Sequence, residues 1–150
     1  MFKVLKRIFI ICFVFIGLVW IYACSLIGVN KEVKKHFSKL KIEIIKQNYR
    51  PNFYVISGRR WKLDNYLLSK MGGAASKSRH KKGEAIDLII FDVNNDGISD
   101  AEDVDIIYDI LDKKIIGNKG GIGTYKNENV FFYKQMVHFD SRGSKARWHR

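Results

Sequence analysis

Three side chains in the second half of the sequence have the chemistry of metal ligands. His80 precedes Asp87 by seven residues, and Gly83 between them permits the chain to turn back. A loop histidine and a carboxylate in the following strand can then meet at one point. Zinc accepts imidazole nitrogen and carboxylate oxygen, and catalytic zinc sites keep three protein ligands and one open position. The pattern therefore suggests zinc.

His138 is the best candidate for a third ligand. It lies among strand-forming apolar residues in the segment 136–140, MVHFD. An unpaired imidazole ring buried in such a strand would be costly, so a partner is expected for it. The plainer alternative is that His80 and Asp87 form only a hydrogen-bonded pair, and the spacing of the residues leaves both interpretations open.

A second cation site is suggested by residues 92–103, where oxygen-bearing side chains alternate around Gly97. Calcium prefers such a set of hard oxygen ligands around a sharp glycine turn. The last position is an aspartate where calcium loops carry glutamate, which weakens the match. The alternative is a solvated acidic turn before a capped helix. The candidate calcium ligands are Asp92, Asn94, Asp96, the backbone carbonyl of Ile98, Asp100 and Asp103.

The elements that would position these residues follow from hydrophobic periodicity and turn signals. Helices are predicted over 31–48, 61–71 and 101–113, the last with Ser99 and Glu102 as a capping box. Strands are predicted over 53–56, 85–91, 122–125, 130–133 and 136–140. This order predicts an α+β domain with a small antiparallel sheet and flanking helices.

The N-terminal segment differs in composition from the rest of the chain. Residues 8–29 contain no charged side chain, and as a helix they would extend about 33 Å, enough to cross a bilayer. Lys3, Lys6 and Arg7 precede them, which favours a cytoplasmic N-terminus. We therefore predict a transmembrane anchor or signal segment over residues 1–29 and a domain over 30–150.

Two other interpretations of this segment stay open. One is a lipoprotein signal with Cys24 as the lipidated residue, and the other is a cleaved signal peptide. All three interpretations place residues 30–150 outside the inner membrane, in the periplasmic part of a bacterial cell envelope.

Charge and cysteine content restrict the partners. The formal net charge is +12, which suits a solvated basic surface, anionic lipid headgroups or anionic wall polymers. No basic nucleic-acid-binding motif is present, so nucleic acid is not an expected partner. Both cysteines, Cys12 and Cys24, lie in the N-terminal segment, so the domain forms no internal disulfide. A monomer is expected.

Several segments resemble one enzyme family in the same order along the chain. Residues 78–88, SRHKKGEAIDL, resemble the SxHxxGxAxD signature of the M15 family of zinc D-Ala-D-Ala peptidases. Residues 57–60 with Asn65 resemble its SGxR…N segment, and residues 72–74 its GGA. Residues 120–125 resemble its GGxGxY, and residues 138–148 its closing HxDxRG…RW. The resemblance covers roughly residues 50–148.

The resemblance implies a fold of the hedgehog/DD-peptidase type and a bound zinc ion. Carried over position by position, it implies His80, Asp87 and His138 as zinc ligands. It also implies that Arg60 contacts a carbonyl or carboxylate of the substrate, and that Ser78 supports the loop or touches substrate. The implied activity is that of a D,D-carboxypeptidase or D,D-endopeptidase acting on peptidoglycan stem peptides.

One position departs from part of the family. Several branches carry an acid three residues before the last histidine ligand, where this chain has Gln135. Asp140 is the substitute candidate for the general base, and its alternative role is to orient a zinc-bound histidine. Gln135 favours one rival function, a catalytically impaired peptidoglycan-binding protein of the same fold. The acidic loop suggests a second, a calcium-stabilised envelope interaction protein.

Overall fold

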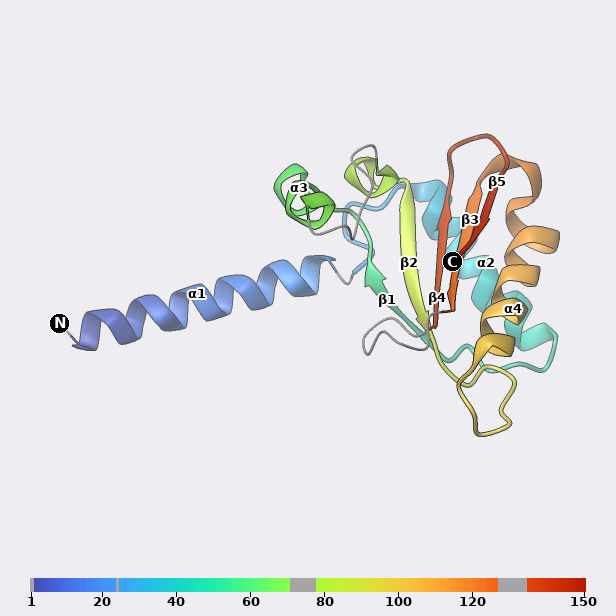
Figure 1. Cartoon of the computed structure of the whole chain (residues 1–150), viewed down its shortest axis with the longest axis horizontal. Helices are drawn as coiled ribbons and strands as arrows, with labels where there is room; N and C mark the ends of the chain where they lie inside the picture. Colours follow the sequence, from blue (N-terminus) through green and yellow to red (C-terminus); the bar gives the residue numbers. More distant parts are fainter. Residues whose placement is uncertain (1, 24, 71–77, 127–134) are drawn as a thin grey trace.

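The computed structural model describes residues 2–23, 25–70, 78–126 and 135–150. An N-terminal helix, α1 (Phe2–Ala23), leads to a domain built on a five-stranded sheet in the order β1-β2-β4-β3-β5 (Figure 1). The strands are β1 (Phe53–Ser57), β2 (Ala85–Ile90), β3 (Gly121–Lys126), β4 (Gln135–Asp140) and β5 (Ala146–His149). The domain helices are α2 (Lys31–Lys46), α3 (Lys62–Lys70) and α4 (Ala101–Ile110).

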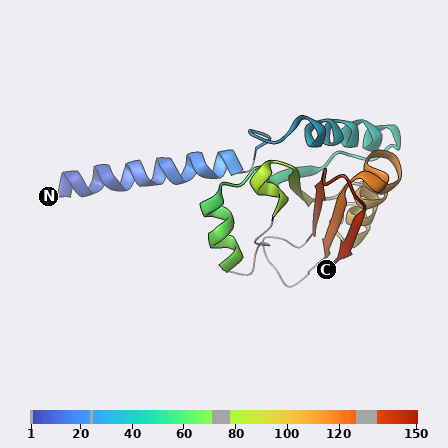
Figure 2. The same ribbon diagram turned by 90° about the horizontal axis from the view of Figure 1, so that it is seen from above.

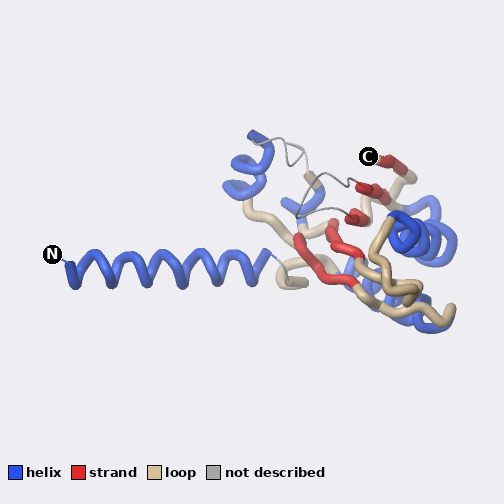
Figure 3. The backbone as a smooth tube through the Cα atoms, turned by 60° about the horizontal axis from the view of Figure 1, so that its bottom comes forward, coloured by secondary structure: helices blue, strands red, loops and turns tan. Residues whose placement is uncertain are grey.

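The α+β class is confirmed, but the sheet is mixed, so the prediction of an antiparallel sheet was wrong in one pairing. β2 pairs antiparallel with β1 and β4, and β4 pairs antiparallel with β3. After β4 the chain turns back and pairs on the far side of β3. Because β3 and β5 both run opposite to β4, they run parallel to each other. β5, which hydrophobic periodicity did not predict, lies at an edge of the sheet (Figure 3).

One face of the sheet packs against α2 and α4. The inward face of α2 is formed by Val33, Phe37, Leu40 and Ile44, all buried. These side chains share a core with alternate residues of the strands, because successive strand residues point to opposite faces. The core strand residues include Ile86, Leu88, Ile90, Ile122, Val137 and Phe139. Figure 2 shows α2 and α3 on opposite sides of the domain.

The start of α4 differs by one residue from the predicted cap. Asp100, not Ser99, is the N-cap, and Asp103 rather than Glu102 completes the capping box. After Ile110 the chain continues as a wider π-helical turn over Leu111–Ile116 instead of ending at residue 113. Arg147 of β5 holds this turn, because its guanidinium pairs with Asp112 and donates to the Gly117 and Gly120 carbonyls.

The N-terminal helix projects away from the domain (Figure 1), and its side chains from Leu5 to Leu18 are exposed. Across the described residues, no helix reaches the length and hydropathy required of a membrane span, so the predicted transmembrane segment is without support there. The chain joins the domain core before residue 30, because Val29 is buried in this core and Leu26 packs against the core.

Some predicted features lie outside the described residues. These are Cys24, the block at residues 72–74, the end of the helix predicted over 61–71, and the strand predicted over 130–133.

Candidate metal centre

A single row of residues crosses the sheet, with one member from each strand. Asp87 pairs with Ser57 on one side and with His138 on the other. Gly123 lies between His138 and Trp148 in the same register. Directly opposed residues project from the same face of a sheet. A bulge in β1 places Ser57, rather than Ile56, opposite Asp87. The row faces away from α2 and α4.

His80 reaches this row from the turn before β2. The turn is a short 3-10 helix, Arg79–Lys82, which ends at Gly83 with a left-handed backbone (φ 70°). A side chain is strained at that φ, so glycine suits the reversal that carries His80 back over β2. Ser78 begins the turn and its hydroxyl accepts a hydrogen bond from the His80 amide at 3.3 Å. Ser78 is therefore the N-cap of the turn, and its predicted contact with substrate stays a prediction.

The three predicted ligands converge. His80 Nε2 lies 3.1 Å from Asp87 Oδ1 and 3.3 Å from His138 Nδ1. His138 Nδ1 lies 2.7 Å from the same carboxylate oxygen. Ligand atoms around a tetrahedral zinc ion with bonds of about 2.0 Å are about 3.3 Å apart. Two of the three separations lie within 0.2 Å of this value, and the shortest, 2.7 Å, must widen most to accept the ion.

In each histidine, one ring nitrogen contacts a protein oxygen, and this contact directs the other ring nitrogen toward Asp87. His80 Nδ1 lies 2.6 Å from the Gly58 carbonyl oxygen, which can only accept, so Nδ1 carries the proton and Nε2 is left to bind a metal. His138 Nε2 lies 3.2 Å from Asp140 Oδ2, which leaves His138 Nδ1 for the shared point. Partners of this kind orient histidine ligands in metal sites.

Asp87 divides its two oxygens between the histidines and Arg60. Oδ1 faces the imidazoles, and Oδ2 accepts from Arg60 Nη2 at 2.6 Å. Arg60 also donates from Nε to the Ser57 hydroxyl at 2.7 Å, so its guanidinium is held in place. Burial opposes ionisation of Asp87, but the two histidines outweigh it and hold the pKa of the carboxyl well below its usual range. Arg60 is therefore a partner of a candidate ligand, which the sequence did not predict.

Asp140 lies behind His138 and is fully buried. Its oxygens accept from the Gly121 amide at 3.0 Å and from the backbone and guanidinium of Arg142. Burial opposes its charge, but the hydrogen bonds from His138 and Arg142 outweigh burial and lower the pKa of the carboxyl. Burial also opposes a charged His138, but the bonds to Asp140 and Asp87 raise the pKa of its ring to about 9.

Trp148 covers the far side of His138. The two ring centroids are 5.2 Å apart, and the Arg142 guanidinium lies 5.3 Å from the indole centroid. The indole lies against Gly123, where a Cβ atom would meet its Cε2 at 2.1 Å. Glycine is required there because any side chain would displace the ring. Trp148 is thus a packing residue that lies against a candidate ligand.

Gln135 does not contact the candidate ligands. It lies three residues before His138, and strand residues at odd spacing face opposite sides of the sheet. Its amide oxygen accepts from the Ser99 hydroxyl at 2.8 Å, and its amide nitrogen donates to the Ser99 carbonyl at 2.9 Å. Gln135 therefore ties β4 to the loop before α4.

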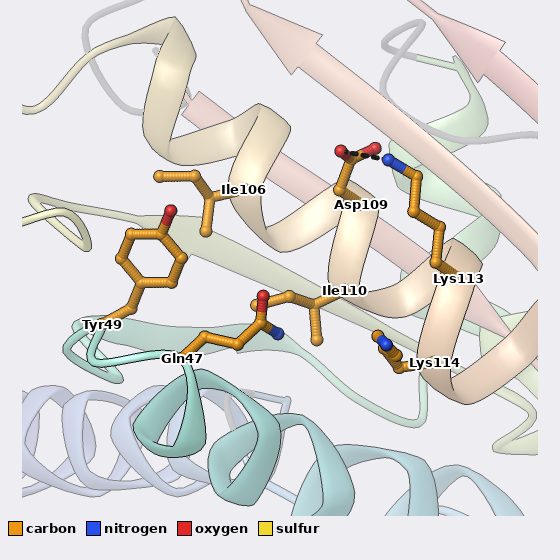
Figure 4. Close-up of a pocket in the computed structure, with 7 residues that line it drawn as sticks. All are labelled: Gln47, Tyr49, Ile106, Asp109, Ile110, Lys113 and Lys114. Carbon is orange, nitrogen blue, oxygen red and sulfur yellow. Dashed lines mark hydrogen bonds and ion pairs between the residues drawn. The ribbon is translucent and has the colours of Figure 1, made fainter.

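Of two surface hollows, one lies beside the turn that carries His80 and the other lies on the helical side of the sheet. One, of about 330 Å³, opens beside the His80 turn and is lined by Ser78, Arg79, Lys81 and Lys82. The other, of about 170 Å³, lies between the end of α2 and α4, on the helical side of the sheet (Figure 4). It contains no candidate ligand.

The acidic loop at 92–103 is held by its own backbone. Asp92 accepts from the Asp96 and Gly97 amides, and Asp96 accepts from the Ile98 amide. Asp103 is fully buried and accepts from the Val93, Asn94 and Asp100 amides. Among the described residues, His80, Asp87 and His138 are the one group of histidines and acids close enough to share an ion. The calcium site stays a prediction.

The residues present fit zinc in number, type, spacing and orientation. Comparison with known proteins adds no relative: no family model, no curated protein and no solved structure matches this chain. The likeness to the M15 family therefore rests on the ordered sequence blocks.

Proposed function

We propose that this protein is a zinc-dependent D,D-peptidase that hydrolyses peptidoglycan stem peptides, as a carboxypeptidase or an endopeptidase. The observation that carries the proposal is the double orientation of the histidines. Gly58 and Asp140 each engage one ring nitrogen, so that His80 Nε2 and His138 Nδ1 face Asp87 Oδ1 at 3.1 Å and 2.7 Å. If His80 and Asp87 formed only a hydrogen-bonded pair, His138 Nδ1 would not need to meet them at the same point.

Each residue has a defined task in the proposed reaction. Zinc, when bound, supplies a Lewis acid that polarises a carbonyl group and activates water. Asp87 and the two histidines would hold it, and Arg60 donates to Asp87 Oδ2, the carboxylate oxygen that does not face the ring nitrogens. Asp140 orients His138, because the Asp140 carboxylate is fully buried and its oxygens accept hydrogen bonds from protein donors. Arg60, whose side chain is 13% exposed, is proposed to contact a substrate oxygen.

The hollow beside the His80 turn supports a substrate that carries carboxylates. Its lining combines the Ser78 hydroxyl with the basic side chains of Arg79, Lys81 and Lys82. Guanidinium and ammonium groups bind carboxylates by charge-assisted hydrogen bonds. Wall stem peptides end in a carboxylate, so we propose that they approach through this hollow.

The activity is tested with the full chain in detergent and two substrates. Release of D-alanine from a D-Ala-D-Ala peptide reports a carboxypeptidase, and cleavage of cross-linked muropeptides reports an endopeptidase. We expect turnover that stops with a chelator, returns with zinc and is absent in His80→Ala. Zinc binding without turnover on either substrate would instead favour the rival function of a peptidoglycan-binding protein.

We further propose that α1 attaches the chain to the inner membrane, by the helix itself or through a lipid on Cys24, with the domain on the periplasmic side. Its support is the run of exposed apolar side chains from Ile8 to Leu18, preceded by Lys6 and Arg7. The test is fractionation of cells after an alkaline wash. Recovery of the chain in the soluble fraction would contradict attachment.

A further inference from the structure

The connection between α1 and α2 packs against the loops that carry the candidate ligands. This connection, residues 25–30, forms a strap between α1 and α2 (Figure 2). Val29 in the strap is 5% exposed and belongs to the core. The strap is therefore part of the domain rather than a loose tether.

The first contact of the strap is with Gly58. A Cβ atom on Gly58 would lie 2.2 Å from the Ser25 carbonyl oxygen and 3.1 Å from a methyl carbon of Val29. The strap thus occupies the space that a side chain would take. The Gly58 carbonyl is the group that accepts from His80 Nδ1 at 2.6 Å. A shift of Gly58 would therefore turn the His80 ring.

The second contact is with the end of the His80 turn. A Cβ atom on Gly83 would lie 2.2 Å from the Gly28 carbonyl oxygen. The Asn30 amide donates to the Gly83 carbonyl at 2.9 Å, while the Gly83 amide donates to the His80 carbonyl at 3.0 Å. The strap and His80 are thus connected to the same glycine from opposite sides.

The third contact reaches the loop after β4. Asn30 Nδ2 donates to the Ser141 hydroxyl at 3.2 Å. Ser141 directly follows Asp140, the carboxylate that accepts from His138. Asn30 also caps α2, since its Oδ1 accepts from the Val33 amide at 2.9 Å. One strap therefore contacts the supports of both histidines.

We infer that the strap is a positioning element of the metal centre: it holds Gly58, Gly83 and Ser141 so that both histidines keep their ligand geometry. The inference rests on the proposed zinc centre but not on the proposed substrate. Residues that orient metal ligands change metal affinity by about 10- to 100-fold when altered. The strap should act on the same scale, although its residues are not ligands.

The test uses the full chain in detergent and Co²⁺ as the probe, because the visible spectrum of Co²⁺ reports its ligand geometry. Gly58→Ala places a methyl group against the Ser25 carbonyl. We expect it to weaken Co²⁺ and Zn²⁺ affinity by about 10- to 100-fold and to change the Co²⁺ spectrum. Gly17→Ala is the matched control, since a Cβ atom there meets nothing within 4 Å. It should leave both unchanged.

Ser141→Ala is a milder second variant in case Gly58→Ala does not fold. It removes the hydroxyl that Asn30 contacts and leaves the cap of α2 intact. We expect an affinity loss of about fivefold, the scale of one hydrogen bond, with Ser144→Ala as the exposed control. A purely structural strap would lower the unfolding midpoint of the metal-free variants but leave the Co²⁺ spectrum and affinity unchanged, and that result would overturn the inference. A wild-type chain that binds no Co²⁺ would remove the proposed zinc centre itself, and the inference with it.

Discussion

The Nε2 atom of His138 and the Oδ2 atom of Asp140 lie 3.2 Å apart, and the Asp140 side chain is fully buried. Two backbone amides and the Arg142 guanidinium also donate to this carboxylate. A general base needs access to the water that it deprotonates. Asp140 is turned toward its protein partners instead, which favours the orienting role over the role of base.

Asp140→Asn distinguishes the two roles. If Asp140 orients His138, the variant loses zinc affinity by about 10- to 100-fold, and turnover partly recovers at saturating zinc. Competition with a chromophoric chelator measures the affinity, and D-alanine release measures turnover. Unchanged zinc affinity with turnover abolished at saturating zinc would show that Asp140 is the base.

Gln135→Glu asks whether a carboxylate at this position adds catalysis. The Gln135 side chain is bonded to Ser99 and lies on the strand face opposite His138. We therefore expect no gain in peptide hydrolysis, and a small loss of stability because the donor to the Ser99 carbonyl is removed. A gain of about 100-fold, the scale of general base catalysis, would contradict this orientation.

Asp103→Asn tests how the acidic loop is held. The buried carboxylate accepts three backbone amides, so the variant should lower the free energy of unfolding by about 1.5–3 kcal/mol. Asp109→Asn is the matched control on α4, because its pair with Lys113 is exposed to solvent and should contribute little to stability. Chemical denaturation with a chelator present measures both. Equal losses in the two variants would contradict the assignment.

Calcium added to the wild-type chain tests the calcium prediction for this loop. A ligand that binds only the folded state raises the unfolding midpoint. A rise with calcium that Asp92→Asn removes would support the site, and calcium binding without zinc would favour the rival function of a calcium-stabilised interaction protein. No rise at millimolar calcium would leave the loop as a self-supporting acidic turn.

His36 on α2 should make the domain less stable in mild acid. Burial of the ring lowers its pKa; Glu32 opposes this, and Lys39 and Lys35 add to it. The unfolded chain then binds a proton near pH 6.5, where the folded chain does not. Stability is therefore full above that pH and falls as the pH drops below it. His36→Gln should flatten the fall in unfolding free energy between pH 7 and pH 5, and an identical fall would contradict the burial effect.

The sequence was sufficient for the elements that periodicity and turn chemistry specify. Helix α2, the strands that carry Asp87 and His138, and the meeting of these two residues with His80 are all present in the structure. Apart from Asp140 and Ser78, the residues that support the ligands were not predicted, because their positions depend on strand register. Nothing in the local pattern of Gly123 or Trp148 indicates that they lie beside His138; pairing between β3, β4 and β5 brings them there.

One predicted cap was wrong and one strand was missed, because local sequence signals compete with each other and with tertiary contacts. Ser99 and Asp100 are both good N-cap residues, and burial of Asp103 beneath the loop selects Asp100. β5 is a four-residue edge strand with two basic residues among its members, and its pairing with β3 rather than its composition makes it a strand. Arg60 contacts Asp87, which local pattern did not indicate, and its contact with substrate stays a prediction.

The most direct test of the zinc centre is the metal content of the purified full chain, measured beside His80→Ala, His138→Ala and the control His149→Ala. His149 lies on β5 and its ring bonds Thr124, away from the three ligand atoms. We predict about one zinc ion per chain in the wild type and in His149→Ala, and none in the other two variants. A wild-type chain without zinc, or zinc retained in His80→Ala, would contradict a centre built from His80, Asp87 and His138.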